Sequence, residues 1–202
     1  MPRFWPPSSR TTRWRTHNVE LFRIFPWDGR TRGDAAGGPL YVPRQKQGAG
    51  RHDIPERDGV LYCSEIAGSA VAEAIKSFRG QSVPRSVFIR PGGMTIALAT
   101  LELDDAIALI DLDDSAHLAS RGITPSQVAS SHRPTTQGIA RRLFDEGSPG
   151  FTWWSALKSS WKNATLFESR VRAHMKIRDV SSLSADLDAV VHAAGEMFVT
   201  FR

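Results

Sequence analysis

The spacing of apolar residues along the chain predicts short strands and helices in no repeating order. Continuous or alternating apolar runs predict strands at residues 19–25, 60–63, 86–90, 95–103, 108–112, 151–155, 164–168 and 196–201. Apolar residues three and four positions apart predict helices at residues 64–78, 114–121, 124–131, 135–146 and 182–194. Because both kinds of element are mixed without a regular strand–helix–strand alternation, we predict a single α+β domain.

Two segments lack this periodicity. Residues 28–58 are rich in Gly, Pro, Arg and Asp, and a loop of that length in a compact domain is either functional or disordered. Residues 1–18 combine Pro with Arg and Trp. We therefore expect a basic N-terminal arm at residues 1–18, outside a domain that spans residues 19–202.

Positive charge is concentrated near the N-terminus. The 202-residue chain has 26 Lys and Arg against 21 Asp and Glu, and residues 1–51 hold ten of the basic but only three of the acidic residues. A basic arm can bind nucleic acid, an acidic protein or a phosphorylated small molecule, or it can remain solvated. Because Trp and Arg are favoured in interfaces, we prefer docking of Trp5 and Trp14 on the domain or on another subunit to stacking on bases. No nucleic-acid-binding signature occurs elsewhere, so we expect no direct nucleic-acid binding.

Several familiar classes are excluded by what the sequence lacks. The single cysteine, Cys63, forms no disulfide within the chain and provides no Cys-based zinc site, and we expect no bound metal. No run approaches the roughly 18 apolar residues of a membrane span, and no signal-like apolar segment follows the N-terminus. We therefore expect a cytoplasmic protein that does not bind membranes. Phosphate-loop, dinucleotide-binding and nucleophile-elbow motifs are also missing, and Gly68-Ser69 is better explained by close packing of a helix.

Three polar residues occupy otherwise apolar surroundings. Arg23 lies within a predicted strand, Glu73 lies in an alanine-rich helix, and Ser155 follows an aromatic strand end. A charge among apolar neighbours needs a partner or a ligand, because an unpaired buried charge is costly. Two explanations remain open at this point. Arg23 and Glu73 form a structural ion pair or face solvent, or the three residues belong to a ligand site.

The order and surroundings of these residues resemble the RES domain family, which is named for an Arg, a Glu and a Ser in that order. The resemblance covers residues 19–168. Its pieces are Leu21-Phe22-Arg23-Ile24, Gly50-Arg51, Gly59-Val60-Leu61-Tyr62-Cys63-Ser64, Ser69-Ala70-Val71-Ala72-Glu73, Thr136-Gln137-Gly138-Ile139-Ala140, Trp154-Ser155, Asn163 and Leu166-Phe167. The sequence departs from the family at two places. His52 and Asp53 replace an aromatic residue and an Asn, and Trp153-Trp154 replaces Tyr-Pro before Ser155.

The resemblance implies a fold, an activity and a partner. The fold is similar to that of the diphtheria-toxin-like ADP-ribosyltransferases. The activity is the destruction of NAD⁺ by a bacterial toxin of an Xre–RES toxin–antitoxin module. The partner is an Xre-type antitoxin, a DNA-binding protein that covers the active site, so we expect a homo-oligomer or a hetero-oligomer with the antitoxin. NAD⁺ is the substrate, and no separate cofactor is expected.

This activity gives each candidate residue a role. Glu73 would stabilise the positive charge that develops on the ribose as nicotinamide leaves, and Ser155 would hydrogen-bond Glu73 or the ribose. Arg23 and Arg51 would bind the pyrophosphate. Tyr62 would contact the nicotinamide ring with its aromatic face and its hydroxyl. Asn163 would contact a ribose or shape its loop.

Three functions stay open at the level of sequence. The first is an NAD⁺ glycohydrolase or phosphorylase, and the sequence does not choose between water and phosphate as the acceptor. The second is an ADP-ribosyltransferase that modifies a protein; its usual second acidic residue is poorly represented by Glu65, eight residues before Glu73. The third is a non-enzymatic domain that binds a partner or nucleic acid.

Overall fold

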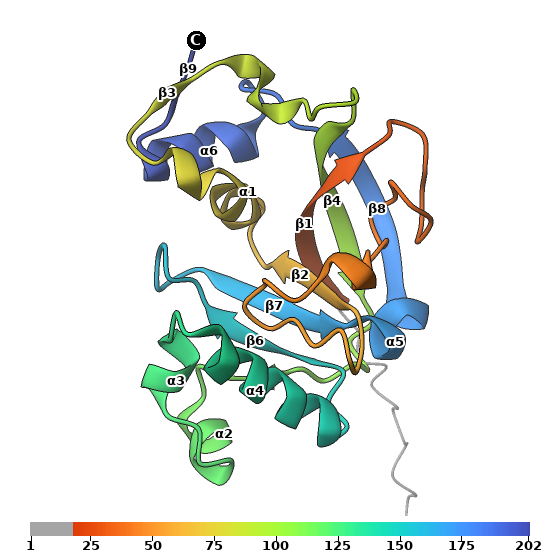
Figure 1. The fold of residues 1–202 in the computed structure, drawn as a ribbon, viewed down its shortest axis with the longest axis vertical. Coiled ribbons are helices and arrows are strands. Elements are labelled where there is room, and N and C mark those ends of the chain that lie inside the picture. Colours follow the sequence, from red (N-terminus) through yellow and green to blue (C-terminus); the bar gives the residue numbers. More distant parts are fainter. Residues whose placement is uncertain (1–17) are drawn as a thin grey trace, which may run out of the picture.

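The computed structural model describes residues 18–202, and its centre is a mixed seven-stranded sheet of order β5-β6-β7-β2-β1-β4-β8 (Figure 1). Only the β5–β6 pair of this sheet is parallel. Two further strands, β3 and β9, form a small parallel sheet. The strands are β1 Val19–Trp27, β2 Val60–Ser64, β3 Ser82–Val83, β4 Thr95–Leu103, β5 Ile110–Asp111, β6 Gly150–Trp154, β7 Lys162–Phe167, β8 Met175–Ser182 and β9 Thr200–Phe201.

The helices are α1 Ala67–Ile75, α2 Ser115–Ser120, α3 Pro125–Ala129, α4 Arg133–Asp145, α5 Glu168–Val171 and α6 Asp188–Met197, with 3₁₀ turns η1 Arg44–Lys46, η2 Lys76–Phe78, η3 Arg85–Phe88 and η4 Arg172–His174. Five of the six helices among the described residues form two groups on one face of the sheet, α1 with α6 and α2 with α3 and α4, whereas α5 packs with the cluster on the opposite face. Local sequence fixes several starts. Asp114 caps α2 through its side chain, and Thr124 and Gln127 form a reciprocal capping box at α3.

The large sheet consists of two halves that are joined at one residue pair. Strands β1 and β4 pair along nine positions and β2 and β7 along five, whereas β1 and β2 pair only at Phe22 and Ser64. We call β5-β6-β7-β2 the β2 half-sheet and β1-β4-β8 the β1 half-sheet. Figure 1 shows the strands of the β1 half-sheet turned steeply against those of the β2 half-sheet. The two halves therefore meet at an angle rather than as one smooth surface.

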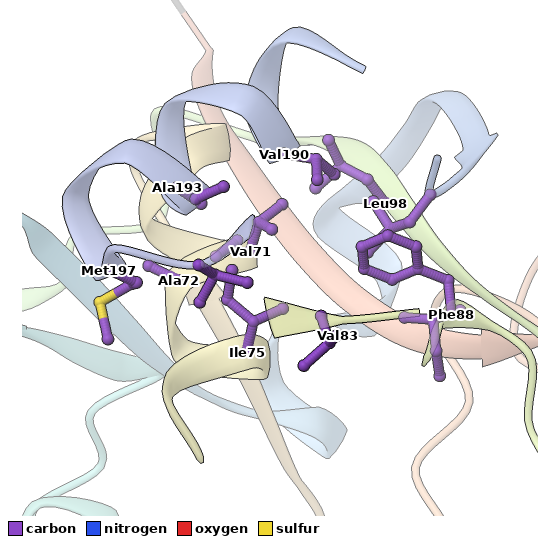
Figure 2. Close-up of a cluster of buried hydrophobic side chains, with 14 of the residues drawn as sticks. Val71, Ala72, Ile75, Val83, Phe88, Leu98, Val190, Ala193 and Met197 are labelled. Carbon is purple, nitrogen blue, oxygen red and sulfur yellow. The ribbon is translucent and has the colours of Figure 1, made fainter. Parts of the chain in front are cut away.

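Each half-sheet packs its own helices on the same face. Phe151 and Phe167 of the β2 half-sheet belong to an apolar cluster with residues of α2, α3 and α4. Leu98 of the β1 half-sheet belongs to a second cluster with α1 and α6 (Figure 2). The opposite face carries a third cluster, in which Leu40 and Val42 of the long loop cover the sheet. The two helix groups thus leave a space between them on the first face.

The contact between α1 and α6 confirms the close packing predicted for Gly68-Ser69. A Cβ added at Gly68 would lie 2.5 Å from Nδ1 of His192 on α6. Figure 2 shows Val71 of α1 beside Val190 and Ala193 of α6. Because α1 carries Glu73, this packing fixes the height of Glu73 above the sheet.

Most predicted elements are present, with ends shifted by a few residues. The predicted strand at 86–90 is wrong: residues 85–88 form η3, in which Phe88 is buried while the next residue, Ile89, is 58% exposed. The apolar run thus forms a 3₁₀ turn after Pro84, and this turn buries the side chain of Phe88. Strand β8 was not predicted, because this edge strand carries mostly polar, exposed residues.

The predicted arm at residues 1–18 lies almost wholly outside the described residues, as do Trp5 and Trp14. Among the described residues, no helix has the length and apolar character needed to cross a bilayer.

Candidate functional site

A cavity of about 730 Å³ lies where the two half-sheets and the two helix groups meet. Its floor follows from strand register. Phe22 pairs with Ser64, Ser64 with Asn163, and Asn163 with Trp153, so these four side chains lie in one row across β1, β2, β7 and β6. Paired residues of a sheet point to the same face, and all four line the cavity. The register of four strands therefore builds the floor of the site.

The carboxylate of Glu73 enters this cavity from α1. Its Oε1 accepts hydrogen bonds from Ser155 Oγ at 2.8 Å and from Asn163 Nδ2 at 3.3 Å. Its Oε2 accepts from Lys76 Nζ at 3.1 Å. The Ser155 hydroxyl in turn accepts from the backbone N–H of Leu157 at 3.1 Å. The structure thus brings together Glu73, Ser155 and Asn163, although Glu73 is 82 and 90 residues from the other two in the sequence.

Two arginines make the side of the cavity near α4 positive. The guanidinium of Arg51 lies 5.0 Å from the ring centroid of Trp153, and its Nη2 donates to the Val128 carbonyl. Its Nε is buried and has no hydrogen-bond partner among residues 18–202. Arg133 is exposed at the first position of the 13-residue helix α4 and also lines the cavity. Burial lowers the pKa of Arg51, and the nearby charge of Arg133 lowers it further while Glu73 acts in the opposite direction. The N-terminal end of α4 adds partial positive charge at the same place.

The loop that carries Arg51 is held by Asp53. One oxygen of its buried carboxylate accepts from the backbone N–H groups of Gly48 and Gly50 at 2.7 and 2.6 Å. The other accepts from the Tyr62 hydroxyl at 2.7 Å. Asp53 therefore ties the turn that precedes Arg51 to strand β2.

Tyr62 lines the cavity, but its hydroxyl is already used. It donates to Asp53 and accepts from the backbone N–H of His52 at 2.8 Å. Burial, followed by the charge of Asp53, raises the pKa of Tyr62 far above its ordinary value, so the hydroxyl stays protonated. The expected hydroxyl contribution to a ligand is therefore not supported, whereas its aromatic ring lies at the cavity.

His52 is a buried, neutral residue behind the site. Its Nδ1 lies 2.8 Å from Thr165 Oγ1, which also accepts from Trp153 Nε1 at 3.0 Å. The ring packs edge-on against Phe151 and Trp153, with centroids 4.9 and 5.0 Å apart. Burial, together with the positive charge of Arg51, holds the pKa of His52 well below 6.5. His52 is thus a core residue, at the position where the family that the sequence resembles has an aromatic residue.

Arg23 does not lie in the cavity, and the expected contact with a pyrophosphate does not fit its position. Its neighbours Phe22 and Ile24 line the cavity, and side chains alternate along a strand, so Arg23 points to the opposite face. There its guanidinium donates to the backbone carbonyls of Pro39 and, at 2.9 Å, of Tyr41. The alternative ion pair with Glu73 is also absent among the described residues. Arg23 holds the long loop against the sheet.

Sequence reasoning missed several residues of the cavity. Ser64 and Ser69 contact Asn163, Lys76 contacts Glu73, and Arg133 lines the positive side. One signal was available for Arg133: the following Pro is typical of a helix start, which placed the Arg at a helix N-terminus. The polar residues Ser77, Arg90 and Ser131 also line the cavity. The larger apolar part of the lining comes from β1, α1, η2, η3, β4 and the residue after β8. It consists of Ile24, Ile75, Phe78, Val87, Phe88, Ile96 and Leu183.

Comparisons with known proteins identify a family and a fold. The sequence model of the RES domain family matches residues 14–188. A chain of the crystal structure of the M. tuberculosis MbcT–MbcA toxin–antitoxin complex superimposes with a TM-score of 0.58 and 14% sequence identity, over 90% of each chain. A search of curated protein sequences returns no match. At this identity the structural likeness shows only that the folds are similar.

Proposed function

The chain belongs to the RES domain family, and from this premise we propose that it is a toxin of a toxin–antitoxin system that cleaves the nicotinamide–ribose bond of NAD⁺. The observation that carries the proposal is the carboxylate of Glu73. It is held by Ser155 and Asn163 inside a cavity whose opposite side carries Arg51 and Arg133. A fixed carboxylate beside cationic groups suits a substrate that joins a cleavable glycosidic bond to a pyrophosphate.

Glu73 acts on the ribose in this proposal. When the bond between C1′ and the nicotinamide nitrogen breaks, its electron pair leaves with nicotinamide and C1′ develops positive charge. A carboxylate at that carbon stabilises this charge. The acceptor oxygen then bonds to C1′ and releases its proton. Water gives ADP-ribose, and inorganic phosphate gives ADP-ribose phosphate.

The remaining residues bind the two ends of the substrate. Arg51 and Arg133 would neutralise the pyrophosphate, for which the planar guanidinium group is well suited. The rings of Tyr62 and Trp153 offer aromatic surface to nicotinamide. A cavity of about 730 Å³ is within the range of small-molecule sites. Arg23, which contacts only loop carbonyls on the opposite face, is removed from the catalytic group.

The fold, partner and location follow as part of the same proposal. We assign the mixed sheet to the diphtheria-toxin-like ADP-ribosyltransferase class. We also assign an Xre-type antitoxin as the partner, in a cytoplasmic oligomer. The neighbour of known structure comes from a toxin–antitoxin complex, and this supports the assignment. Residues 1–18 remain a proposed arm that docks on the domain or on a second subunit.

The test is incubation of the purified protein with NAD⁺, with and without inorganic phosphate, followed by chromatography of the products. We expect release of nicotinamide that is abolished in Glu73→Gln. The matched control is Glu65→Gln, which changes an exposed carboxylate outside the cavity lining. Full nicotinamide release by Glu73→Gln would exclude the assigned role, and no release by the wild type would refute the proposal.

The same experiment separates the other functions. Transfer of a tagged adenosine from NAD⁺ to a protein band would indicate an ADP-ribosyltransferase. Steeply salt-dependent binding to DNA without NAD⁺ turnover would indicate a nucleic-acid-binding domain instead.

A further inference from the structure

We propose that Ser64 and Ser69 are positioning residues, which fix the amide of Asn163 and through it the carboxylate of Glu73. The inference rests on the proposed function for its kinetic consequence, whereas the hydrogen-bond chain itself is a property of the fold. Both serine hydroxyls donate to the amide oxygen of Asn163 rather than to the Glu73 carboxylate. Their effect on the carboxylate therefore passes through Asn163.

The hydrogen bonds fix which way the Asn163 amide points. Ser64 Oγ donates to Asn163 Oδ1 at 2.6 Å, and Ser69 Oγ donates to the same oxygen at 3.3 Å. The amide nitrogen is thereby turned toward Glu73 and donates to its Oε1 at 3.3 Å. The reverse orientation would place the amide oxygen against the carboxylate, where two acceptors repel each other. Two hydroxyl donors on the oxygen therefore select the amide orientation that supports Glu73.

Strand β2 and helix α1 place the two serines against Asn163 from different directions. Ser64 is the last residue of β2 and is the direct cross-strand partner of Asn163 on β7. Ser69 and Glu73 lie four residues apart on α1, on the same face of that helix. Asn163 is thus contacted by the strand beside it and by the helix above it.

Burial makes these contacts consequential. Ser64, Ser69 and Asn163 are exposed by 3%, 0% and 3%. Hydrogen bonds in such a place are not readily replaced by water, so loss of either hydroxyl leaves the amide oxygen with a single donor.

The kinetic test is a double-mutant cycle between Ser64 and Asn163. Loss of one buried hydrogen bond corresponds to about 1.4 kcal/mol, so we expect Ser64→Ala to lower kcat for nicotinamide release about tenfold. KM for NAD⁺ should change less than about twofold, because the substrate contacts remain. Ser64→Thr, which keeps the hydroxyl, should restore kcat, and Ser86→Ala, an exposed serine outside the cavity lining, should leave it unchanged.

Two further measurements complete the test, one on Ser69 and one in the Asn163→Ala background. Ser69→Ala, which removes the longer hydrogen bond, should lower kcat less than Ser64→Ala does. In an Asn163→Ala background Ser64→Ala should have no further effect, because there is no amide left to position. An equal loss of kcat in both backgrounds, or a rise in KM alone, would overturn the inference.

A spectroscopic measurement tests the chain of contacts without enzyme activity. The sequence has only two asparagines, Asn18 and Asn163, so labelling of asparagine side chains with ¹⁵N gives two amide signals. Asn18 is exposed, with its amide donating to Glu102 at the surface, and it serves as the internal reference. We expect slow solvent exchange of the Asn163 amide and at least about tenfold faster exchange in the Ser64→Ala, Ser69→Ala double variant. Exchange of wild-type Asn163 as fast as that of Asn18 would overturn the inference. A protected amide in a protein that releases no nicotinamide would refute the proposed function alone.

Discussion

Replacement of Arg23 by Met tests whether this arginine supports the loop rather than the substrate. The guanidinium is largely buried and donates to the carbonyls of Pro39 and Tyr41. Burial lowers the pKa of Arg23, with a smaller opposing effect of Cys63, so the buried charge itself carries a desolvation cost. Arg23→Met removes both hydrogen bonds and also removes this cost.

The magnitude follows from these two opposing contributions. A hydrogen bond from a charged donor contributes about 1.5–3 kcal/mol, and relief of the desolvation cost offsets part of the sum. We therefore expect the free energy of unfolding to fall by about 2–4 kcal/mol. For a domain of this size each kcal/mol lowers Tm by roughly 2–4 °C, so the shift should be about 4–16 °C. Arg23→Lys should lie between the wild type and Arg23→Met, since one ammonium replaces a planar group that reaches two carbonyls.

The assay combines urea or thermal denaturation with NAD⁺ kinetics measured well below the lowest Tm. We expect a clear loss of stability with KM and kcat changed less than about threefold. An unchanged Tm together with a large rise in KM would show that Arg23 reaches the substrate, and the placement argued from strand alternation would be wrong.

Two further changes test packing and protonation. Gly150→Ala would place a Cβ 2.5 Å from the Thr165 carbonyl oxygen of the neighbouring strand, so we expect a loss of about 1–3 kcal/mol in unfolding free energy. Gly195→Ala, on α6 with no atom within 4 Å of the added Cβ, should instead stabilise by about 0.5–1 kcal/mol, and equal denaturation midpoints for the two variants would contradict this reasoning. Because the folded pKa of His52 is depressed below 6.5, the unfolded state binds the proton first and stability is lost as pH falls below 6.5, by at most about 1.4 kcal/mol per pH unit. Denaturation across that pH range should show a smaller slope for His52→Phe, and an unchanged slope would mean that His52 is not the responsible group.

Sequence patterns predicted the strands best where a strand is buried in the sheet. Residues 95–103 form β4 as predicted, because its apolar side chains pack in a core on each face of the sheet. β8 is one residue shorter than β4 and lies at the sheet edge, so it lacks the apolar signal. Residues 86–90 have the apolar pattern of a strand, but only Ile89 pairs with a neighbouring segment, so the run does not form a strand. The apolar pattern therefore indicates which residues are buried. It does not indicate which segments pair as strands, because strand pairing depends on the rest of the fold.

The same limit explains the outcome at the candidate site. Glu73 and Ser155 were singled out as polar residues among apolar neighbours, and they are found together. Arg23 met the same criterion and lies on the other face. Alternation states which residues share a face with Arg23, but it does not state which of the two faces carries the cavity. Only the packing of α1 and α4 above the sheet decides that.

The single residue pair between β1 and β2 gives the cavity a geometry of its own. The cavity is lined from both half-sheets, and the Phe22–Ser64 pair is where β1 joins β2. The width of the cavity therefore depends on the angle between the two half-sheets where they meet, at Phe22 and Ser64. The size of ligand that the cavity admits then depends on the packing beneath this junction as well as on the lining side chains. Substitutions in the core beneath the junction therefore offer a route to a wider or narrower cavity with every lining side chain unchanged.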